Sequence, residues 1–96
     1  MKNILTTEIT DLSKYQIIDV RTKEEFSESH IPNSQNIPVE NLIDEQIPNL
    51  KKDMPLLVYC ETGARSLVAC QILDQHNYKT HNLVGGLTAW NHKKPS

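Results

Sequence analysis

The run Leu56-Leu57-Val58-Tyr59 constrains the fold most, because four consecutive apolar or aromatic residues are typical of a strand buried on both faces. Cys60 follows this run directly, and Gly63 permits a tight turn shortly afterwards. Ser66 can then cap a helix that runs through residues 67–73. The sequence therefore predicts a buried strand, a short loop and a helix, with a cysteine at the point where the strand ends.

A thiol in this position lies where loop N–H groups converge beside the positive end of a helix dipole. Such surroundings lower the pKa of a free thiol from about 8.5 to roughly 3.5–7.5. We therefore predict that Cys60 is a nucleophile, and the alternative is a small residue that fills the core. Cys70 lies inside the predicted helix, at a spacing from Cys60 that matches neither a C-x-x-C motif nor a zinc site. We predict that Cys70 packs in the core, and the alternative is a resolving thiol that forms a disulfide with Cys60.

The bulk properties exclude several classes of protein. A chain of 96 residues, of which 38% are hydrophobic, predicts a single domain over residues 1–96 with a modest core. With a net charge of −2, the chain lacks the excess of basic residues that is typical of nucleic-acid-binding proteins. No apolar stretch approaches the roughly 20 residues of a membrane span, and residues 1–8 lack the apolar segment of a secretory signal. We expect a cytoplasmic protein without nucleic-acid or membrane partners.

Strand and helix patterns alternate along the chain, which predicts an α/β fold with a mainly parallel central sheet flanked by helices on both faces. Thr22 and Glu25 form a capping box for one helix, and Asn77 can end another in the left-handed conformation. Sites in such sheets form at the carboxyl ends of the strands, where Cys60 lies. The predicted strands are 4–6, 15–20, 35–37, 55–59 and 79–83, and the predicted helical segments are 7–12, 22–29, 39–47, 66–76 and 87–91.

Three segments of the sequence carry recognisable motifs, which are Ile18-Asp19-Val20-Arg21 with Glu25-Phe26, His30-Ile31-Pro32-Asn33-Ser34 and Asn36-Ile37-Pro38; the loop Cys60-x-x-Gly63-x-Arg65-Ser66; and Leu83-Val84-Gly85-Gly86-Leu87-Thr88-Ala89-Trp90. In this order they resemble the signatures of the rhodanese family, and the match spans about residues 5–92. Asn33-Ser34 replaces the usual Gly-Ala of that family. Asn77 replaces a frequent glycine, which asparagine can imitate because it tolerates left-handed geometry.

The resemblance implies a single-domain sulfurtransferase with a rhodanese-like fold and no metal or organic cofactor. Cys60 would take a sulfane sulfur from a donor such as thiosulfate or a persulfide and pass it to a thiol or cyanide. The implied partners are these small donors and acceptors or a protein persulfide. The alternative is a non-enzymatic rhodanese-like module that binds a partner or carries sulfur in a relay. The implied site comprises catalytic Cys60, substrate-binding Glu61, Thr62, Gly63, Ala64 and Arg65, and supporting Asp19, Arg21 and Ser66.

The length of the loop separates two chemistries. Four residues lie between Cys60 and Arg65, whereas tyrosine phosphatases, including those with rhodanese-like folds, have five. Because a phosphoryl group needs a wider cradle of N–H groups than one sulfur atom, the shorter loop favours sulfur transfer over phosphate-ester hydrolysis.

Four polar residues have competing interpretations. Glu61 is either a screened, solvent-facing side chain or a carboxylate that directs the enzyme from small dianions toward persulfide donors. Asp19 and Arg21 point the same way along a strand, so we expect a structural ion pair rather than a catalytic pair. His30 is predicted to form a hydrogen bond in a turn rather than to act as a base.

Overall fold

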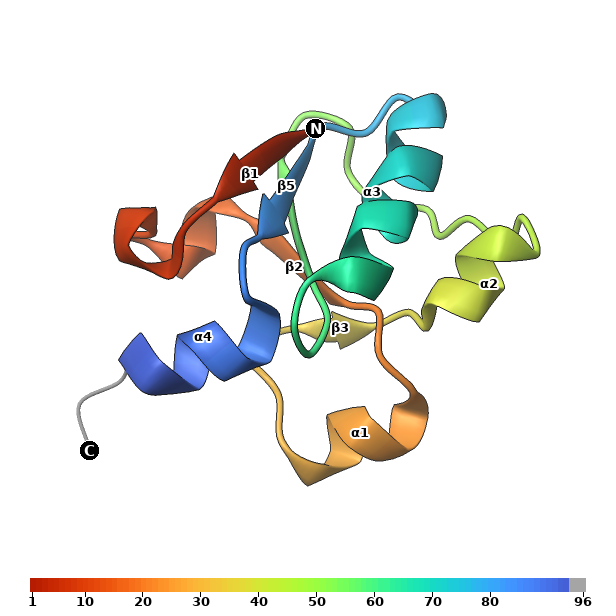
Figure 1. Cartoon of the computed structure of the whole chain (residues 1–96). Coiled ribbons are helices and arrows are strands. Elements are labelled where there is room, and N and C mark those ends of the chain that lie inside the picture. Colours follow the sequence, from red (N-terminus) through yellow and green to blue (C-terminus); the bar gives the residue numbers. More distant parts are fainter. Residues whose placement is uncertain (94–96) are drawn as a thin grey trace.

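A five-stranded sheet forms the centre of the computed structural model, which describes residues 1–93, and all neighbouring strands are parallel (Figure 1). This arrangement confirms the predicted fold class. The strands are β1 (Lys2–Ile4), β2 (Gln16–Asp19), β3 (Gln35–Asn36), β4 (Leu56–Tyr59) and β5 (Thr80–Leu83), in the spatial order β1-β5-β4-β2-β3. The helices are α1 (Lys23–Glu28), α2 (Val39–Ile43), α3 (Ala64–Gln75) and α4 (Gly86–Lys93), and two 3-10 turns are η1 (Thr6–Glu8) and η2 (Leu12–Lys14).

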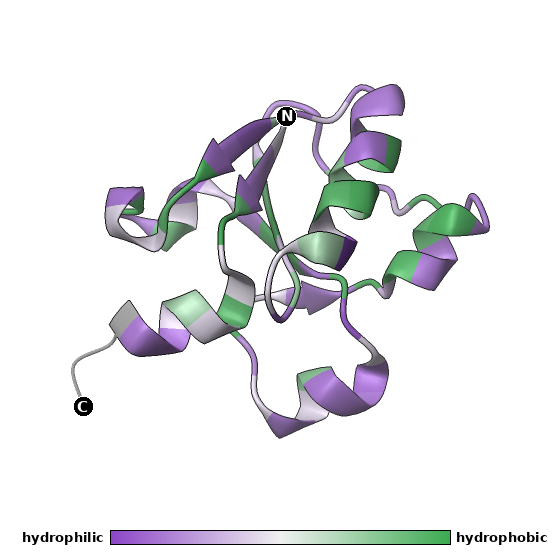
Figure 2. Ribbon diagram, viewed as in Figure 1, coloured by the Kyte–Doolittle hydropathy of each residue, from purple (hydrophilic) through white to green (hydrophobic). Residues whose placement is uncertain are grey.

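The core has two layers because side chains alternate between the faces of each strand. On one face, Val58 and Cys60 pack with residues of α2 and α3 such as Leu42 and Leu73. On the other face, β4 contributes Leu57 and Tyr59 to a second cluster that also contains Leu87 and Trp90 of α4. Figure 2 shows hydrophobic residues on α2 and α3 as green bands. Both faces of the sheet are therefore covered, and every residue of β4 is buried as its apolar run predicts.

Local sequence signals set several element ends. Thr22 accepts a hydrogen bond from the Glu25 N–H at 3.2 Å, and the Glu25 carboxylate accepts one from the Thr22 N–H at 3.1 Å. This is the predicted capping box at the start of α1. Asn33 and Asn77 have φ values of 67° and 69°, so asparagine occupies left-handed positions that usually favour glycine.

The predicted boundaries are wrong at the N-terminal end. The first strand covers Lys2–Ile4 rather than residues 4–6, because it is defined by its parallel pairing with β5. Over residues 7–12 the sequence predicts a helical turn or a short helix, and the structure has two separate 3-10 turns, η1 and η2, each of three residues and each extending beyond the predicted range. Among residues 1–93, no helix has the length and apolar character needed to cross a membrane.

Candidate active site

The Cys60 loop connects the end of β4 with α3 at the carboxyl edge of the sheet. Cys60 is 1% exposed, and Gly63 turns the chain with a φ of 122°, a conformation that L side chains rarely adopt. Gly63 is also the residue immediately before α3, which begins at Ala64. The prediction that Ser66 caps this helix is therefore wrong, because the turn at Gly63 allows the helix to begin two residues earlier.

The sulfur of Cys60 accepts one hydrogen bond from the loop and contacts a hydroxyl of α3. The Gly63 N–H donates to Cys60 Sγ at 3.0 Å, and Ser66 Oγ lies 3.5 Å from the same sulfur. Burial alone would raise the pKa of the Cys60 thiol. The Ser66 hydroxyl and the backbone N–H groups of Ser66, Gly63 and Thr62 outweigh burial, so the pKa of Cys60 is lowered.

The second cysteine has the opposite environment. Cys70 is fully buried in the cluster between the sheet and α3, and burial raises its pKa to about 11. Both cysteines are free thiols, and Cys70 packs in the core as predicted.

We expect iodoacetamide at neutral pH to modify Cys60 much faster than Cys70, because the thiolate is the reactive form and is more populated where the pKa is lower. Peptide mass mapping after timed alkylation measures the two rates separately. Labelling of Cys70 at the same rate as Cys60, in protein that remains folded, would contradict this assignment of the reactive thiol.

The start of α4 holds the first two residues of the loop in place. The Leu87 N–H donates to the Cys60 carbonyl at 2.9 Å, and the Thr88 N–H donates to the Glu61 carbonyl at 3.1 Å. Gly86 has a φ of 58°, and a Cβ atom there would lie 2.7 Å from the Glu61 carbonyl oxygen and closer still to that of Cys60. The backbones can approach only because residue 86 is glycine. The glycine pair at residues 85 and 86 predicts a turn, but not its contact with the cysteine loop.

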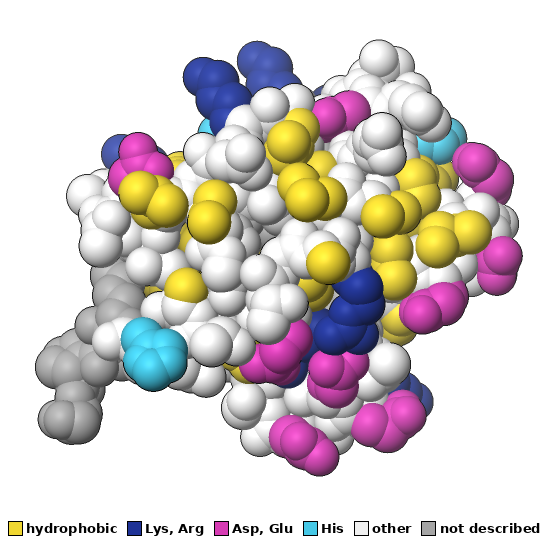
Figure 3. Space-filling model, viewed as in Figure 1, with side chains coloured by type: hydrophobic (Ala, Val, Ile, Leu, Met, Phe, Trp, Pro, Cys, Tyr) yellow, Lys and Arg dark blue, Asp and Glu magenta, His cyan; other side chains and the backbone are white. Residues whose placement is uncertain are grey.

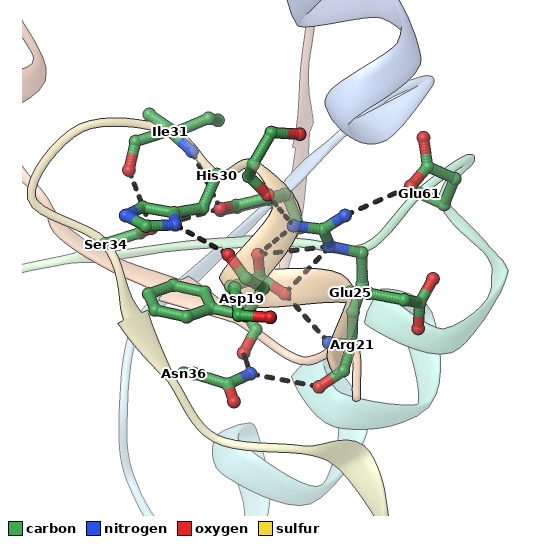
Figure 4. A network of polar contacts seen from close by, with 12 residues as sticks. Asp19, Arg21, Glu25, His30, Ile31, Ser34, Asn36 and Glu61 are labelled. Carbon is green, nitrogen blue, oxygen red and sulfur yellow. Dashed lines mark hydrogen bonds and ion pairs between the residues drawn. The ribbon is translucent and has the colours of Figure 1, made fainter. Parts of the chain in front are cut away.

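Asp19 and Arg21 form a buried ion pair beside the loop, as shown in Figure 4. The guanidinium Nη2 lies 2.7 Å from Asp19 Oδ2 and donates to the Ser29 carbonyl at 2.5 Å. Its Nη1 donates to Glu61 Oε1 at 3.1 Å. Burial alone would lower the pKa of Arg21, but the Asp19 and Glu61 carboxylates raise it. Arg21 therefore links the end of β2 to the residue after the cysteine.

Glu61 is bound on two sides. Besides the ion pair with Arg21, its Oε2 accepts a hydrogen bond from Thr88 Oγ1 at 3.1 Å. The side chain is 43% exposed, so it contacts both solvent and the protein. The first interpretation, a solvent-facing side chain, therefore describes only part of its environment.

Arg65 pairs with Glu25 rather than with the loop. Its two terminal nitrogens lie 2.8 Å and 3.0 Å from the two Glu25 oxygens. Hydrogen bonding from Arg65 lowers the pKa of Glu25 to about 2, and the same pair raises the pKa of Arg65. The capping box indicates the role of Glu25 at the start of its helix. No sequence signal indicates that Glu25 pairs with Arg65, because these two residues are forty positions apart.

Three further residues named in the sequence analysis lie at the surface of the loop or in a separate turn. Thr62 and Ala64 are exposed at the loop surface. His30 forms a turn contact, with Nδ1 2.8 Å from the Phe26 carbonyl oxygen and its ring stacked on Phe26. Within residues 1–93 no group of three His, Cys, Asp or Glu side chains is placed to hold a metal ion.

The sequence model of the rhodanese-like domain family matches residues 5–93 of this chain. A protein named as a sulfurtransferase in Allochromatium vinosum is 34% identical over 87 residues, which cover 90% of this chain and 80% of that protein. The thiosulfate sulfurtransferase GlpE of Coxiella burnetii is 32% identical over 81 residues, 83% of this chain and 75% of that one. The crystal structure of a rhodanese-like domain protein from Staphylococcus aureus superposes with a TM-score of 0.83 at 32% identity, covering 94% of this chain and 91% of that one.

Proposed function

Because the chain belongs to the rhodanese-like domain family, we propose that it is a sulfurtransferase in which Cys60 carries the transferred sulfur as a persulfide. Relatives named as sulfurtransferases, which share about a third of its residues, support this activity in general. The observation that carries the proposal is the buried Cys60 sulfur that accepts the Gly63 N–H at 3.0 Å and has a lowered pKa.

The proposed reaction has two displacements at sulfur. The Cys60 thiolate attacks the sulfane sulfur of the donor, a new S–S bond forms, and the donor's S–S bond breaks. The bonding electrons leave with the donor, as sulfite from thiosulfate or as a thiolate from a persulfide. An acceptor such as cyanide or a thiolate then attacks the outer sulfur, and Cys60 leaves again as the thiolate. Loop N–H groups stabilise the anionic sulfur in each state, and α4 holds the loop that supplies them.

The charges around the loop favour a persulfide donor over thiosulfate. The two arginines of the sequence are both paired, Arg21 with Asp19 and Glu61, and Arg65 with Glu25. Three carboxylates therefore surround two guanidinium groups, which leaves one negative charge in excess. Figure 3 shows acidic side chains beside the basic ones at the centre of this face. A small dianion is repelled by this arrangement and must displace a carboxylate to reach a guanidinium.

The surface on the other side of the loop is less polar. A groove of about 280 Å³ lies against Thr62 and Gly63, and its other lining residues include Leu67 and Val84. Both of these apolar side chains are exposed, at 45% and 39%. Apolar atoms beside the Cys60 loop suit the organic part of a thiol persulfide better than the charged oxygens of thiosulfate.

Steady-state sulfur transfer to cyanide from thiosulfate and from a low-molecular-weight persulfide tests this proposal. We expect transfer from both, with the larger kcat/KM for the persulfide. A larger kcat/KM for thiosulfate would overturn the proposed donor preference but would still support the sulfurtransferase activity. No transfer from either donor would overturn the activity and favour the non-enzymatic module.

Glu61→Gln is expected to raise kcat/KM for thiosulfate by about threefold at low salt, because it removes a carboxylate from the residue after Cys60 and leaves the charge of Arg21 less neutralised. The gain is expected to shrink as the salt concentration rises, and to be smaller for the persulfide of a thiol whose organic part is uncharged, because that donor carries at most one negative charge and thiosulfate carries two. Glu40→Gln is the matched control, because it removes the same charge from an exposed residue of α2. An unchanged thiosulfate rate for Glu61→Gln at low salt would show that Glu61 does not influence donor choice.

A further inference from the structure

Asn82 is a buried polar residue of β5 whose side chain contacts Ser66 of α3. It is 4% exposed, and in the sheet it pairs with Val58 of β4, two residues before Cys60. A buried amide costs free energy unless its donors and acceptors find partners. Its Oδ1 lies 2.5 Å from Ser66 Oγ, and its Nδ2 donates to Asn3 Oδ1 of β1 at 3.2 Å.

Ser66 has one hydroxyl proton and three groups around its oxygen that can accept it. Asn82 Oδ1 lies at 2.5 Å, the Gly63 carbonyl oxygen at 2.9 Å and Cys60 Sγ at 3.5 Å. Because a hydroxyl donates one hydrogen bond, the short contact with Asn82 draws the proton away from sulfur. The Cys60 thiol then donates to Ser66 Oγ, and Ser66 donates to Asn82.

An anionic sulfur needs the opposite arrangement. When Cys60 is a thiolate or carries a persulfide, the Ser66 hydroxyl stabilises it only by turning its proton toward sulfur. An amide can allow this, because it can rotate to present Nδ2 to Ser66 Oγ in place of Oδ1. A carboxylate at the same position accepts but never donates, so it would keep the Ser66 proton on its own side.

We propose that Asn82 is a positioning residue that sets the direction of the Ser66 hydroxyl and thereby controls hydrogen bonding to the Cys60 sulfur. The inference rests on the proposed role of Cys60 as the nucleophile. This inference is tested by the ionisation of the Cys60 thiol and not by turnover. A negative result for Asn82 is therefore distinguishable from a failure of the proposed activity.

Other groups around Cys60 also act on its charge. Arg65 and Cys70, both on α3, interact electrostatically with it. Glu61 follows it in the chain, and the Asp19–Arg21 pair lies at the end of the neighbouring strand β2. These groups stay unchanged in variants of Asn82, so such variants isolate the contact through Ser66.

The test is the pH dependence of Cys60 alkylation by iodoacetamide, followed by mass mapping of the Cys60 peptide. We expect Asn82→Asp to move the midpoint to higher pH and to slow alkylation at neutral pH by about tenfold, which corresponds to one pKa unit. In a Ser66→Ala background the same substitution is expected to shift the midpoint much less, since the hydroxyl that Asn82 directs is gone. Thr80→Val is the control on the same strand, because Thr80 bonds Asp74 rather than Ser66.

An unchanged midpoint in folded Asn82→Asp would overturn the proposal. A shift that persists fully without the Ser66 hydroxyl would also overturn it, because the new charge would then act directly on sulfur. Asn3→Ala is a second variant, at an exposed residue of an edge strand. It removes the acceptor of Asn82 Nδ2 and frees the amide to turn, so we expect the midpoint to move to lower pH. No shift, or a shift to higher pH, would contradict the proposal even if Asn82→Asp does not fold.

Discussion

Replacing Cys60 by serine is expected to lower the rate of sulfur transfer by at least ~10³-fold, to the level of the uncatalysed reaction. Serine keeps the size of the side chain, but its hydroxyl is not ionised at neutral pH and its oxygen cannot carry the persulfide. The loop contacts with Gly63 and Ser66 remain available to the oxygen, so the fold should be retained. Coupled assays of sulfite or thiolate release, with circular dichroism as the check on folding, measure both effects.

Cys70→Ala is the matched control for this variant. Cys70 is buried and makes no direct contribution to the loop that binds sulfur, so most of the activity should remain. The small cavity should lower the free energy of unfolding by about 1 kcal/mol. More than a few per cent of residual activity in Cys60→Ser, or loss of activity in folded Cys70→Ala, would contradict the assignment of Cys60.

Replacing Gly86 by alanine is expected to lower the free energy of unfolding by about 3 kcal/mol. The new Cβ would press on the carbonyl oxygens of Cys60 and Glu61, and alanine would also be strained at a φ of 58°. Because 1 kcal/mol shifts Tm by about 4–8 °C in a domain of this size, the expected loss is roughly 15 °C. Alkylation of Cys60 in the folded fraction should also slow, since α4 can no longer hold the loop in place.

Asn77→Ala separates the effect of strain from the effect of contact. Asn77 has a φ of 69°, so alanine there adopts a similar left-handed conformation at the end of α3, away from the cysteine loop. We expect a loss of about 1 kcal/mol and unchanged alkylation of Cys60. A Gly86→Ala protein that melts within a few degrees of the parent and reacts normally at Cys60 would show that the close approach of α4 is unimportant.

Short-range sequence signals predicted much of the fold. The apolar run before Cys60 predicts a strand buried on both faces, and the Thr22 capping box and the left-handed position of Asn77 are present in the structure. These features depend on residues within one turn or one strand, so the sequence expresses them directly. The order of the strands does not follow from such local signals, because it depends on contacts between distant segments. For example, β1 pairs with β5, which lies near the other end of the chain.

The parts of the site that the sequence missed depend on contacts between distant segments. The pairing of Arg65 with Glu25 joins residues on α3 and α1, and the bonds from α4 to the loop require the backbone of Gly86 to pass close to Cys60. The error at Ser66 has a local cause, because either Gly63 or Ser66 could begin the helix by the preferences of single residues. Ser66 instead lies inside α3 and contacts Asn82 across the core.

The sulfur that Cys60 is proposed to carry can be detected directly. Intact-mass and peptide mass spectrometry after incubation with a low-molecular-weight persulfide, and separately with thiosulfate, measures the adduct before any acceptor is added. We expect a gain of one sulfur atom on the Cys60 peptide, its absence in Cys60→Ser, and its loss when cyanide or a thiol is added. A folded protein that gains no sulfur from either donor, or gains it at Cys70 instead, would rule out Cys60 as the sulfur carrier.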